Sequence, residues 1–258
     1  MSSKFETFRE LHQSVDLLVL PNAWDAKSAL LLQGEKFPAI ATSSAAVASS
    51  LGYEDGEGMS FEDYLFVIRR ILSVTQVPLS VDMEMGYGTS DEEIYANVCK
   101  LVELGVAGIN IEDSAIGRDG RGLKDARLFA KTIAYLKNGL VSGGSNLFVN
   151  VRCDTFILNV PDKQQETSRR AKLYETAGAD GLFLPCICQE EDIAEVVRQT
   201  KLPLNVMCIP GLPGFEVLAG LGVKRVSMGP FLFEKVYEDI GRFSRAIAAD
   251  KSFLPLFS

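Results

Sequence analysis

Eight short apolar segments recur along the chain, and they constrain its fold more than any other feature. Each has four or five residues rich in Val, Ile, Leu and Phe, without clean polar alternation. Such segments are typical of strands buried on both faces of a parallel sheet. The eight predicted strands are residues 17–20, 39–42, 79–82, 108–112, 148–152, 181–185, 204–207 and 225–228.

Stretches with helical periodicity separate these segments. Residues 60–72 begin with a capping-box pattern at Ser60 and Asp63, and residues 90–104 end before Gly105. Strand–helix alternation predicts parallel strands with right-handed crossovers. Eight such units in 258 residues favour a single (β/α)8 TIM barrel, of class α/β, over residues 1–258. An open dinucleotide-binding sheet is disfavoured because no GxGxxG follows the first strand.

Composition excludes several partners and sites. A formal net charge of −8 argues against nucleic acid and anionic membranes, which attract clustered Lys and Arg. No signal peptide and no apolar run long enough to span a membrane are found. The cysteine count of five is odd, so we expect reduced, mostly buried thiols in a cytoplasmic protein. The spacing of these cysteines does not suggest a zinc site.

Polar side chains follow almost every predicted strand, directly after its apolar run. In a TIM barrel the carboxyl ends of the strands carry the chemistry, so we expect the active site there. The residues at or just after the strand ends are Asn22, Trp24 and Asp25, Thr42 to Ser44, Asp82 and Glu84, Glu112 and Asp113, and Arg152 and Asp154. The seventh predicted strand carries Asn205 within it.

Four carboxylates stand at two neighbouring strand ends. Asp82 and Glu84 are two residues apart and should share one side of an extended strand, with Glu112 and Asp113 beside them. Carboxylates this close repel unless a cation neutralises them, and oxygen ligands favour Mg²⁺ or Mn²⁺. The alternative is that they are surface carboxylates on loops.

Other strand-end residues suggest substrate contacts. Arg152 could bind a substrate carboxylate or phosphonate with its planar fork, or could merely balance Glu112 or Asp154. The Thr42–Ser43–Ser44 turn could bind an anionic oxygen, or could only permit tight packing. Trp24 is either a pocket wall or core. Residues 114–124 have the polar, Gly-rich composition of a mobile lid; the alternative is a disordered surface loop.

Five motifs resemble those of the isocitrate lyase/phosphoenolpyruvate mutase superfamily over nearly the whole chain. They are PNAWDAKSA at 21–29, ATSSAAVASSLGYED at 41–55, VDMEMGYG at 81–88, NIEDS at 110–114 and VRCDT at 151–155. The resemblance implies Mg²⁺ and an enolate of pyruvate or a related keto acid. It also implies a homo-oligomer, dimer or tetramer, that swaps a last helix at residues 230–249.

The resemblance also implies roles for individual residues. Asp82 would be the direct metal ligand, with Glu84 and Glu112 binding directly or through water and Asp55 nearby. Arg152 and the Ser43–Ser44–Ala45 turn would hold the pyruvyl unit. For the remaining roles we assign Arg152, Glu112, Asp55 and Tyr87 to catalysis. We assign Trp24 and Asn205 to substrate binding.

Departures from the family pattern leave the substrate open. Glu84 stands where Asp is commoner, and the lid SAIGRDGRGLK lacks the Lys-x-Cys-Gly motif whose thiol is the acid of isocitrate-type lyases. Tyr87, Arg118, Arg121 and Lys124 are unranked candidates for that acid. The leading hypothesis is a lyase or decarboxylase of a small 2-hydroxy- or 2-keto-(di)carboxylate. The alternatives are a phosphonopyruvate mutase or hydrolase, and a non-catalytic binder of α-keto acids.

Overall fold

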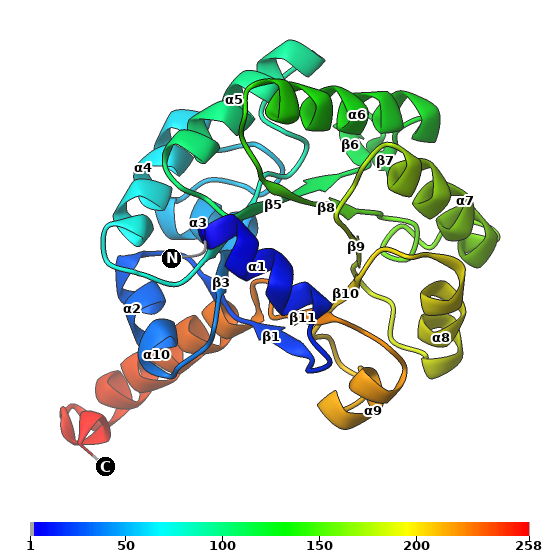
Figure 1. Ribbon diagram of the computed structural model, residues 1–258. Helices are drawn as coiled ribbons and strands as arrows, with labels where there is room; N and C mark the ends of the chain where they lie inside the picture. Colours follow the sequence, from blue (N-terminus) through cyan, green and yellow to red (C-terminus); the bar gives the residue numbers. More distant parts are fainter. Residues whose placement is uncertain (1–2, 258) are drawn as a thin grey trace.

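A ring of parallel strands surrounded by helices forms the body of the protein (Figure 1). The computed structural model describes residues 3–257. The strands pair in the order β1-β11-β10-β9-β8-β5-β4-β3-β2, which confirms the predicted α/β barrel. Their bounds are β1 (Leu18–Leu20), β2 (Asn22–Ala23), β3 (Ile40–Thr42), β4 (Leu79–Asp82), β5 (Gly108–Glu112), β8 (Phe148–Arg152), β9 (Gly181–Leu184), β10 (Leu204–Met207) and β11 (Arg225–Ser227). All eight predicted strands are present, with ends that differ by at most one residue.

Pro21 explains why the barrel has nine strands where eight were predicted. Proline has no backbone N–H to donate, and the first predicted strand is divided there into two short strands. β1 pairs with β11, and β2 pairs with β3. The side chain of Asn22 bridges the same gap. Its Nδ2 donates to Thr42 O (2.7 Å), and its Oδ1 accepts from Met228 N (2.9 Å) and Gly229 N (3.0 Å).

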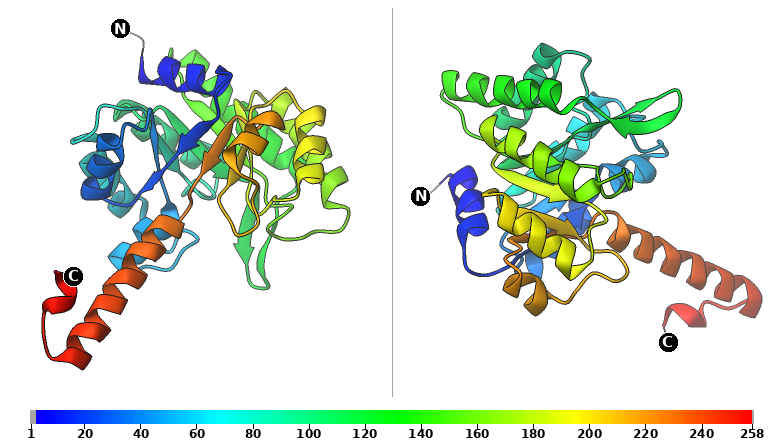
Figure 2. Two further views of the ribbon diagram at one scale, coloured as in Figure 1. Left: turned by 90° about the horizontal axis from the view of Figure 1, so that it is seen from below. Right: turned by 90° about the vertical axis from the view of Figure 1, so that its right-hand side faces the viewer.

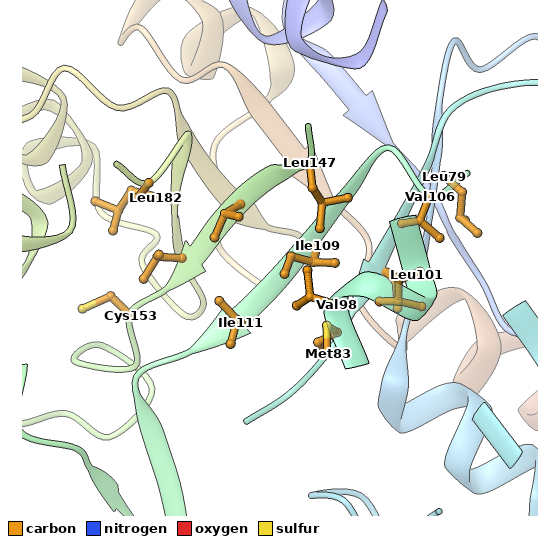
Figure 3. Packing of buried hydrophobic residues seen from close by; sticks show 14 of the residues in the cluster. Leu79, Met83, Val98, Leu101, Val106, Ile109, Ile111, Leu147, Cys153 and Leu182 are labelled. Atoms are coloured by element: carbon orange, nitrogen blue, oxygen red, sulfur yellow. The ribbon is translucent and has the colours of Figure 1, made fainter. Parts of the chain in front are cut away.

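The outer faces of the strands pack against the ring of helices. Figure 3 shows this layer, where Ile109 and Ile111 of β5 meet Val98 and Leu101 of α5. Ser60 caps α4 as predicted, accepting from Asp63 N (3.1 Å). The helices are α1 (Lys4–Gln13), α2 (Ala26–Gly34), α3 (Ser44–Leu51), α4 (Phe61–Leu72), α5 (Asp91–Glu103), α6 (Ala126–Ser142), α7 (Lys163–Thr176), α8 (Glu190–Gln199), α9 (Phe215–Gly220), α10 (Phe231–Asp250) and the short 3₁₀ helix η1 (Leu254–Leu256).

Helix α1 covers the amino-terminal end of the barrel. Phe8 is fully buried and meets Phe148 edge-on at 5.5 Å between ring centroids. The His12 ring stacks on Phe148 at 4.2 Å, and its Nδ1 donates to Phe8 O (2.8 Å). Gly108 makes room for this plug, because a Cβ there would lie 2.8 Å from Phe8 Cε1. The amino-terminal end is therefore closed.

The opposite end carries two protruding elements (Figure 2). One is an antiparallel hairpin of β6 (Ser114–Gly117) and β7 (Gly120–Leu123). The lid expected at residues 114–124 is thus a hairpin, and the alternative of a disordered loop is wrong. The other is α10, which extends away from the barrel and begins one residue later than predicted.

The cysteines form no disulfide. Cys153 is buried, but Cys99, Cys186, Cys188 and Cys208 are partly exposed, so the expectation of mostly buried thiols is wrong for four of them. None of the helices within residues 3–257 has the length and apolar character needed to cross a membrane.

Candidate active site

A cavity of about 180 Å³ opens at the carboxyl ends of the strands. Seven residues that the sequence singled out line it, and they come from four of the five motifs: Asn22, Ser43, Ser44, Ala45, Asp55, Asp82 and Arg152. Its other lining residues are Asn110, Ile157, Phe183, Pro185, Met207, Ser227, Gly229 and Pro230. The cavity lies where TIM-barrel enzymes place their active sites.

Asp82 is the most firmly positioned acid of the cavity. Its backbone N–H donates to Thr42 Oγ1 (3.0 Å), and its carbonyl accepts from the buried Tyr64 hydroxyl (3.0 Å). Its carboxylate Oδ2 accepts from Ser44 Oγ (2.8 Å) and lies 3.4 Å from Ser44 N. Buried neighbours therefore fix Asp82 at the end of β4.

Asp55 contributes a second carboxylate from the loop after α3. Desolvation at the rim and the nearby Asp82 carboxylate raise the pKa of Asp55, while Arg121 and Arg152 lower it. Two carboxylates at one cavity repel each other, and a cation between them would stabilise the pair.

Arg152 faces the cavity while paired with two buried carboxylates. Its Nε and Nη2 donate to Asp154 Oδ1 (2.7 Å) and Oδ2 (3.3 Å), and its Nη1 lies 2.9 Å from Glu112 Oε2. Burial opposes the charge, but Glu112 and Asp154 hold the pKa of Arg152 above its ordinary value. Arg152 therefore balances both acids, as the alternative interpretation expected, and it also presents a cation to the cavity.

The amino terminus of α3 borders the same cavity. Ser43 caps this helix by accepting from Ala46 N (3.3 Å). Backbone N–H groups in a first helical turn lack helical partners and favour anions. The Ser43–Ser44–Ala45 segment is thus suited to contact a substrate oxygen.

Asn110 lines the cavity, and two buried side chains, Asn150 and Arg225, determine the orientation of its amide group. Its Oδ1 accepts from Asn150 Nδ2 (2.9 Å) and lies 3.3 Å from Nη2 of the fully buried Arg225. Arginine can only donate, so the atom that faces it must be the oxygen. The Asn110 Nδ2 group is left as a donor on a side chain that lines the cavity.

Glu84 and Tyr87 do not lie where the sequence analysis expected them. β4 ends at Asp82, and Glu84 and Tyr87 adopt left-handed φ angles of 49° and 54°. The Glu84 carboxylate accepts from Glu57 N (2.7 Å) and from the Tyr87 hydroxyl (2.7 Å), and neither side chain lines the cavity. Burial raises the pKa of Glu84 to about 7. Strand alternation beyond Asp82 was therefore the wrong assumption.

Glu112 and Asp113 are also engaged within the protein. Glu112 is buried between Arg152 and Arg121, whose Nη1 also donates to Ser114 Oγ (2.9 Å). Asp113 Oδ2 accepts from the Tyr174 hydroxyl (2.7 Å) and pairs with Arg170 at 3.0 Å. Neither acid is among the residues that line the cavity. Burial and the Asp154 and Asp82 charges raise the pKa of Glu112, while Arg152 and Arg121 lower it, so Glu112 lies near Asp82.

Two predicted substrate contacts lie outside the cavity. Trp24 packs edge-on against Phe233 at 5.3 Å between centroids, in an apolar groove between α2 and α10. Asn205 is buried one layer below the cavity, where its Nδ2 donates to Val206 O (2.6 Å) and Ser227 Oγ (3.2 Å). Asn205 supports the cavity-lining Ser227 and does not itself line the cavity.

The acids of the cavity match one kind of metal ion. Within residues 3–257 no three His, Cys, Asp or Glu side chains are close enough to enclose a metal. Mg²⁺ does not need such a cage, because it keeps several waters and binds through one or two carboxylates plus its substrate. Asp82 and Asp55 provide such a pair on one cavity, so these two residues fit Mg²⁺, whereas Glu84 and Glu112 are not among the residues that line it.

The hairpin packs directly against the loop that carries Asp55. A Cβ on Gly56 would overlap Ile116 Cδ1 of β6 and lie 3.8 Å from Arg121 Nη2 of β7. Gly56 adopts a left-handed φ of 92°, which also favours glycine. The hairpin and the Asp55 loop therefore meet beside the cavity.

Comparison with known proteins agrees with this geometry. The family model described as phosphoenolpyruvate phosphomutase matches residues 8–248. The chain belongs to this family. The uncharacterized Mycobacterium tuberculosis protein Rv1998c is 38% identical over 223 residues, which cover 86% of this chain and 81% of Rv1998c. A solved Burkholderia cenocepacia structure, provisionally named a phosphonomutase, is 33% identical with a TM-score of 0.88 and covers 94% of this chain and 98% of that one.

Relatives in the family have different activities. A 2-methylisocitrate lyase of Aeropyrum pernix is 28% identical over 201 residues, covering 76% of this chain and 63% of the lyase. Oxaloacetate decarboxylases are also among the relatives. These matches place the chain in the isocitrate lyase/phosphoenolpyruvate mutase superfamily of enzymes. The reaction differs between the members of this superfamily.

Two polar residues that line the cavity were not predicted from the sequence. Asn110 lies two residues before Glu112, and Ser227 lies two residues after Arg225. Because side chains alternate along a strand, each of these pairs points into the barrel. Applying that alternation inside the strands would have found both residues. No local signal marks Phe183 or Met207, which look like ordinary apolar strand residues.

Proposed function

We propose that this protein is a Mg²⁺-dependent lyase or decarboxylase of a small 2-hydroxy- or 2-keto-(di)carboxylate. One observation carries the proposal: Asp82 and Arg152 line the same small cavity at the ends of β4 and β8. A carboxylate for a hard divalent cation and a guanidinium for a substrate carboxylate are the two charges that such chemistry needs.

The chain's own residues would divide the work as follows. Asp82 and Asp55 would hold the cation, which would stabilise negative charge on the substrate oxygen as the carbon–carbon bond breaks. Arg152 would bind the substrate carboxylate, and the first turn of α3 with Asn110 would orient the remaining oxygens through N–H donors. The β6–β7 hairpin would limit the access of water beside the Asp55 loop.

A carbon–phosphorus enzyme is the second candidate. The family model carries the description phosphoenolpyruvate phosphomutase, and Arg152 would suit a phosphonate as well as a carboxylate. A third candidate, a binder of α-keto acids without activity, would use the same charges.

A substrate panel distinguishes these candidates. Oxaloacetate, methylisocitrate, dimethylmalate and phosphonopyruvate are each incubated with protein and Mg²⁺, while pyruvate and phosphate are measured. We expect pyruvate without phosphate. Phosphate release would replace the proposal by a hydrolase, and a direct product assay on phosphonopyruvate detects a mutase. Turnover of none of the four, with pyruvate still bound, would favour the binder.

We also propose that the protein is a homo-oligomer, with α10 contacting a second copy. α10 extends from the barrel (Figure 2) and leaves Tyr237 and Ile240 about half exposed. Phe253 and Phe257, which follow it, are 68% and 84% exposed. A run of exposed apolar residues on one protruding element is typical of a protein interface.

A further inference from the structure

A layer of polar side chains crosses the barrel interior beneath the cavity. It consists of Asn110, Asn150, Asn205 and Arg225, from four of the strands that enclose the interior (Figure 1). Asn110 is paired in register with Asn150 on β5 and β8, and Asn205 with Arg225 on β10 and β11. All four are buried, and only Asn110 also lines the cavity. This polar layer therefore has one member that a substrate can contact.

The three amides of the polar layer are all oriented by hydrogen bonds. Asn205 Nδ2 donates to Val206 O (2.6 Å) and Ser227 Oγ (3.2 Å). Asn205 Oδ1 accepts from Asn150 Nδ2 (3.2 Å), which also donates to Asn110 Oδ1 (2.9 Å). The oxygen of Asn110 is thus directed into the layer and its nitrogen toward the cavity.

Asn110 Nδ2 is the donor that this arrangement leaves unused. Within residues 3–257 no protein group accepts from it, and the atom is not enclosed by protein. If the amide turned over, its N–H groups would lie against Arg225, which can only donate. The N–H groups of Asn110 are therefore held toward the cavity.

Arg225 carries a fully buried charge with few partners. Its Nη2 donates to Asn110 Oδ1 (3.3 Å), while its Nε and Nη1 have no hydrogen-bond partner within residues 3–257. On the side of α1, its Cζ lies 6.0 Å from the centroid of the Phe8 ring. Burial lowers the pKa of Arg225 to about 9, and the Asp82 charge raises it, so the guanidinium stays charged at neutral pH.

The Arg225 charge strengthens the donor in the cavity. A charge in a poorly solvated interior acts on its neighbours more strongly than in water. Arg225, the Asn110 amide and a ligand oxygen would form a chain of hydrogen bonds, in which each bond polarises the next. The Asn110 N–H groups are then better donors, above all to a negative oxygen, because a hydrogen bond to an ionised acceptor is roughly twice as strong.

A negative oxygen is what the proposed reaction creates. When the carbon–carbon bond of a 2-keto acid breaks, its electron pair moves onto the 2-oxygen, which becomes an enolate oxygen. In a decarboxylation, carbon dioxide leaves in the same step, and a proton taken up by the neighbouring carbon then restores a keto acid. Donors that already point at this oxygen stabilise the transition state more than the substrate.

Resting on the proposed function, we propose that Asn110 Nδ2 donates to the substrate oxygen that becomes negative, and that Arg225 is a positioning residue acting through Asn110. Asn110 would then recognise the charge on the reacting oxygen and not only orient it. Arg225 does not line the cavity; it holds the amide in the donating orientation and polarises its N–H groups.

Two stable ligands separate this recognition of charge from simple binding. Oxalate is a planar dianion that resembles the enolate of pyruvate, whereas pyruvate presents a neutral carbonyl oxygen at the same place. Calorimetric titration of the whole protein in Mg²⁺ gives the ratio of the oxalate affinity to the pyruvate affinity. Asn110→Ala should weaken oxalate binding by about thirtyfold and pyruvate binding by only about fivefold, since the lost hydrogen bond has a charged acceptor in oxalate alone.

A matched control removes a different polar group from the barrel interior. Ser80 is buried on β4, and its Oγ has no partner within residues 3–257. Ser80→Ala should leave the affinity ratio unchanged, because Ser80 contributes nothing to the orientation of Asn110.

Variants of Arg225 test the positioning role. Arg225→Met should lower the affinity ratio as Asn110→Ala does, and Arg225→Lys, which can still donate to Asn110 Oδ1, should retain most of it. Combining Asn110→Ala with Arg225→Met should lower the ratio no further, because residues that act through one another are not additive. A merely structural Arg225 would change thermal stability and leave the ratio as it is.

A crystal structure of the unchanged protein with oxalate and Mg²⁺ provides a test that needs no variant to fold. Asn110 Nδ2 should lie within hydrogen-bonding distance of an oxalate oxygen, with Asn110 Oδ1 still at Arg225. An oxalate without that contact, or an amide turned the other way, would overturn the proposal.

The possible failures are distinguishable. If neither oxalate nor pyruvate binds the unchanged protein in Mg²⁺, the proposed function fails, and the role of Asn110 fails with it. If both bind but Asn110→Ala weakens them equally or not at all, Asn110 does not recognise charge, and the proposed function stands. If Arg225→Met is folded and keeps the ratio, the positioning role of Arg225 alone is overturned.

Discussion

Arg170, on the outer helix α7, pairs with Asp113 at 3.0 Å, and both side chains are almost completely buried. Asp113 directly follows the end of β5, and Arg170 Nη2 also donates to Lys124 O (2.9 Å), just beyond β7. Asp113 Oδ1 accepts from Asp154 N (2.9 Å). One buried acid thus joins the barrel, the outer helix and the base of the hairpin.

Asp113→Ala should destabilise the protein strongly. The variant leaves the Arg170 charge buried without its carboxylate, which typically costs about 3–5 kcal/mol. Urea denaturation measures the change. Glu195→Ala is the matched control, because it breaks the exposed pair with Arg198, which should cost less than about 1 kcal/mol. Equal losses in the two variants would contradict a structural role for Asp113.

Asp82→Ala should abolish Mg²⁺ binding at the site while the barrel stays folded. Asp82 is the fixed carboxylate of the cavity, and the backbone bonds of residue 82 do not need its side chain. Calorimetry with Mg²⁺ measures binding, and circular dichroism measures folding. Asp16→Ala removes an exposed acid far from the cavity in sequence and should bind Mg²⁺ as the unchanged protein does. Undiminished binding by Asp82→Ala would refute the metal site.

Arg152→Lys should raise KM by roughly tenfold or more, since lysine lacks the planar fork that holds a carboxylate. The same change weakens the contacts with Asp154 and Glu112, so folding is checked alongside. The measurement is KM for whichever panel substrate is turned over. An unchanged KM would remove Arg152 from substrate binding.

His12 should make the stability of the protein fall as the pH falls below neutrality. Burial, followed by the nearby Arg225 charge, lowers the pKa of His12 to about 3, against about 6.5 for a free imidazole. Between these values only the unfolded chain binds the proton, so stability is complete above pH 6.5 and is lost toward pH 3. From pH 7 to pH 5 the loss attributable to His12 is about 2 kcal/mol.

The variant His12→Phe isolates this contribution, because His12 is the only histidine of the chain. Urea denaturation at the two pH values should show a smaller loss of stability in the variant. An identical loss in both proteins would mean that His12 is charged in the folded state.

Ile240→Glu on α10 should dissociate the proposed oligomer. A carboxylate replaces a half-exposed apolar side chain of the protruding helix and would lose its hydration in an interface. Sedimentation velocity measures the mass. Ser244→Glu on the same helix is the control, since Ser244 is exposed and polar. A monomeric unchanged protein would refute the oligomer itself.

The strands and the position of the site could be predicted because they depend on local patterns. Apolar runs marked the strands of the barrel, and the polar residues after them indicated which end of the barrel carries the cavity. The orientation of Glu84 could not be predicted in this way. It depends on a left-handed backbone at Glu84 and on donors from Glu57 and Tyr87. Only the folded chain brings these groups together.

The partners of Trp24 and Arg121 were unpredictable for a related reason. Trp24 is about two hundred residues from Phe233 in the sequence, and its position depends on where α10 leaves the barrel. Arg121 reaches Glu112 because residues 114–123 form a hairpin. Their Gly-rich composition had suggested a mobile lid and not a hairpin, since glycine-rich segments carry little information about strand pairing.

The Asn22 bridge has a consequence for the direction of the last helix. Met228 and Gly229, which donate to Asn22 Oδ1, stand immediately before α10, and Thr42, which accepts from Asn22 Nδ2, ends β3 beside the cavity. A single amide therefore anchors the base of α10 to the rim of the barrel. The direction in which α10 leaves the barrel therefore depends on Asn22, the same side chain that joins the first and last strands of the ring.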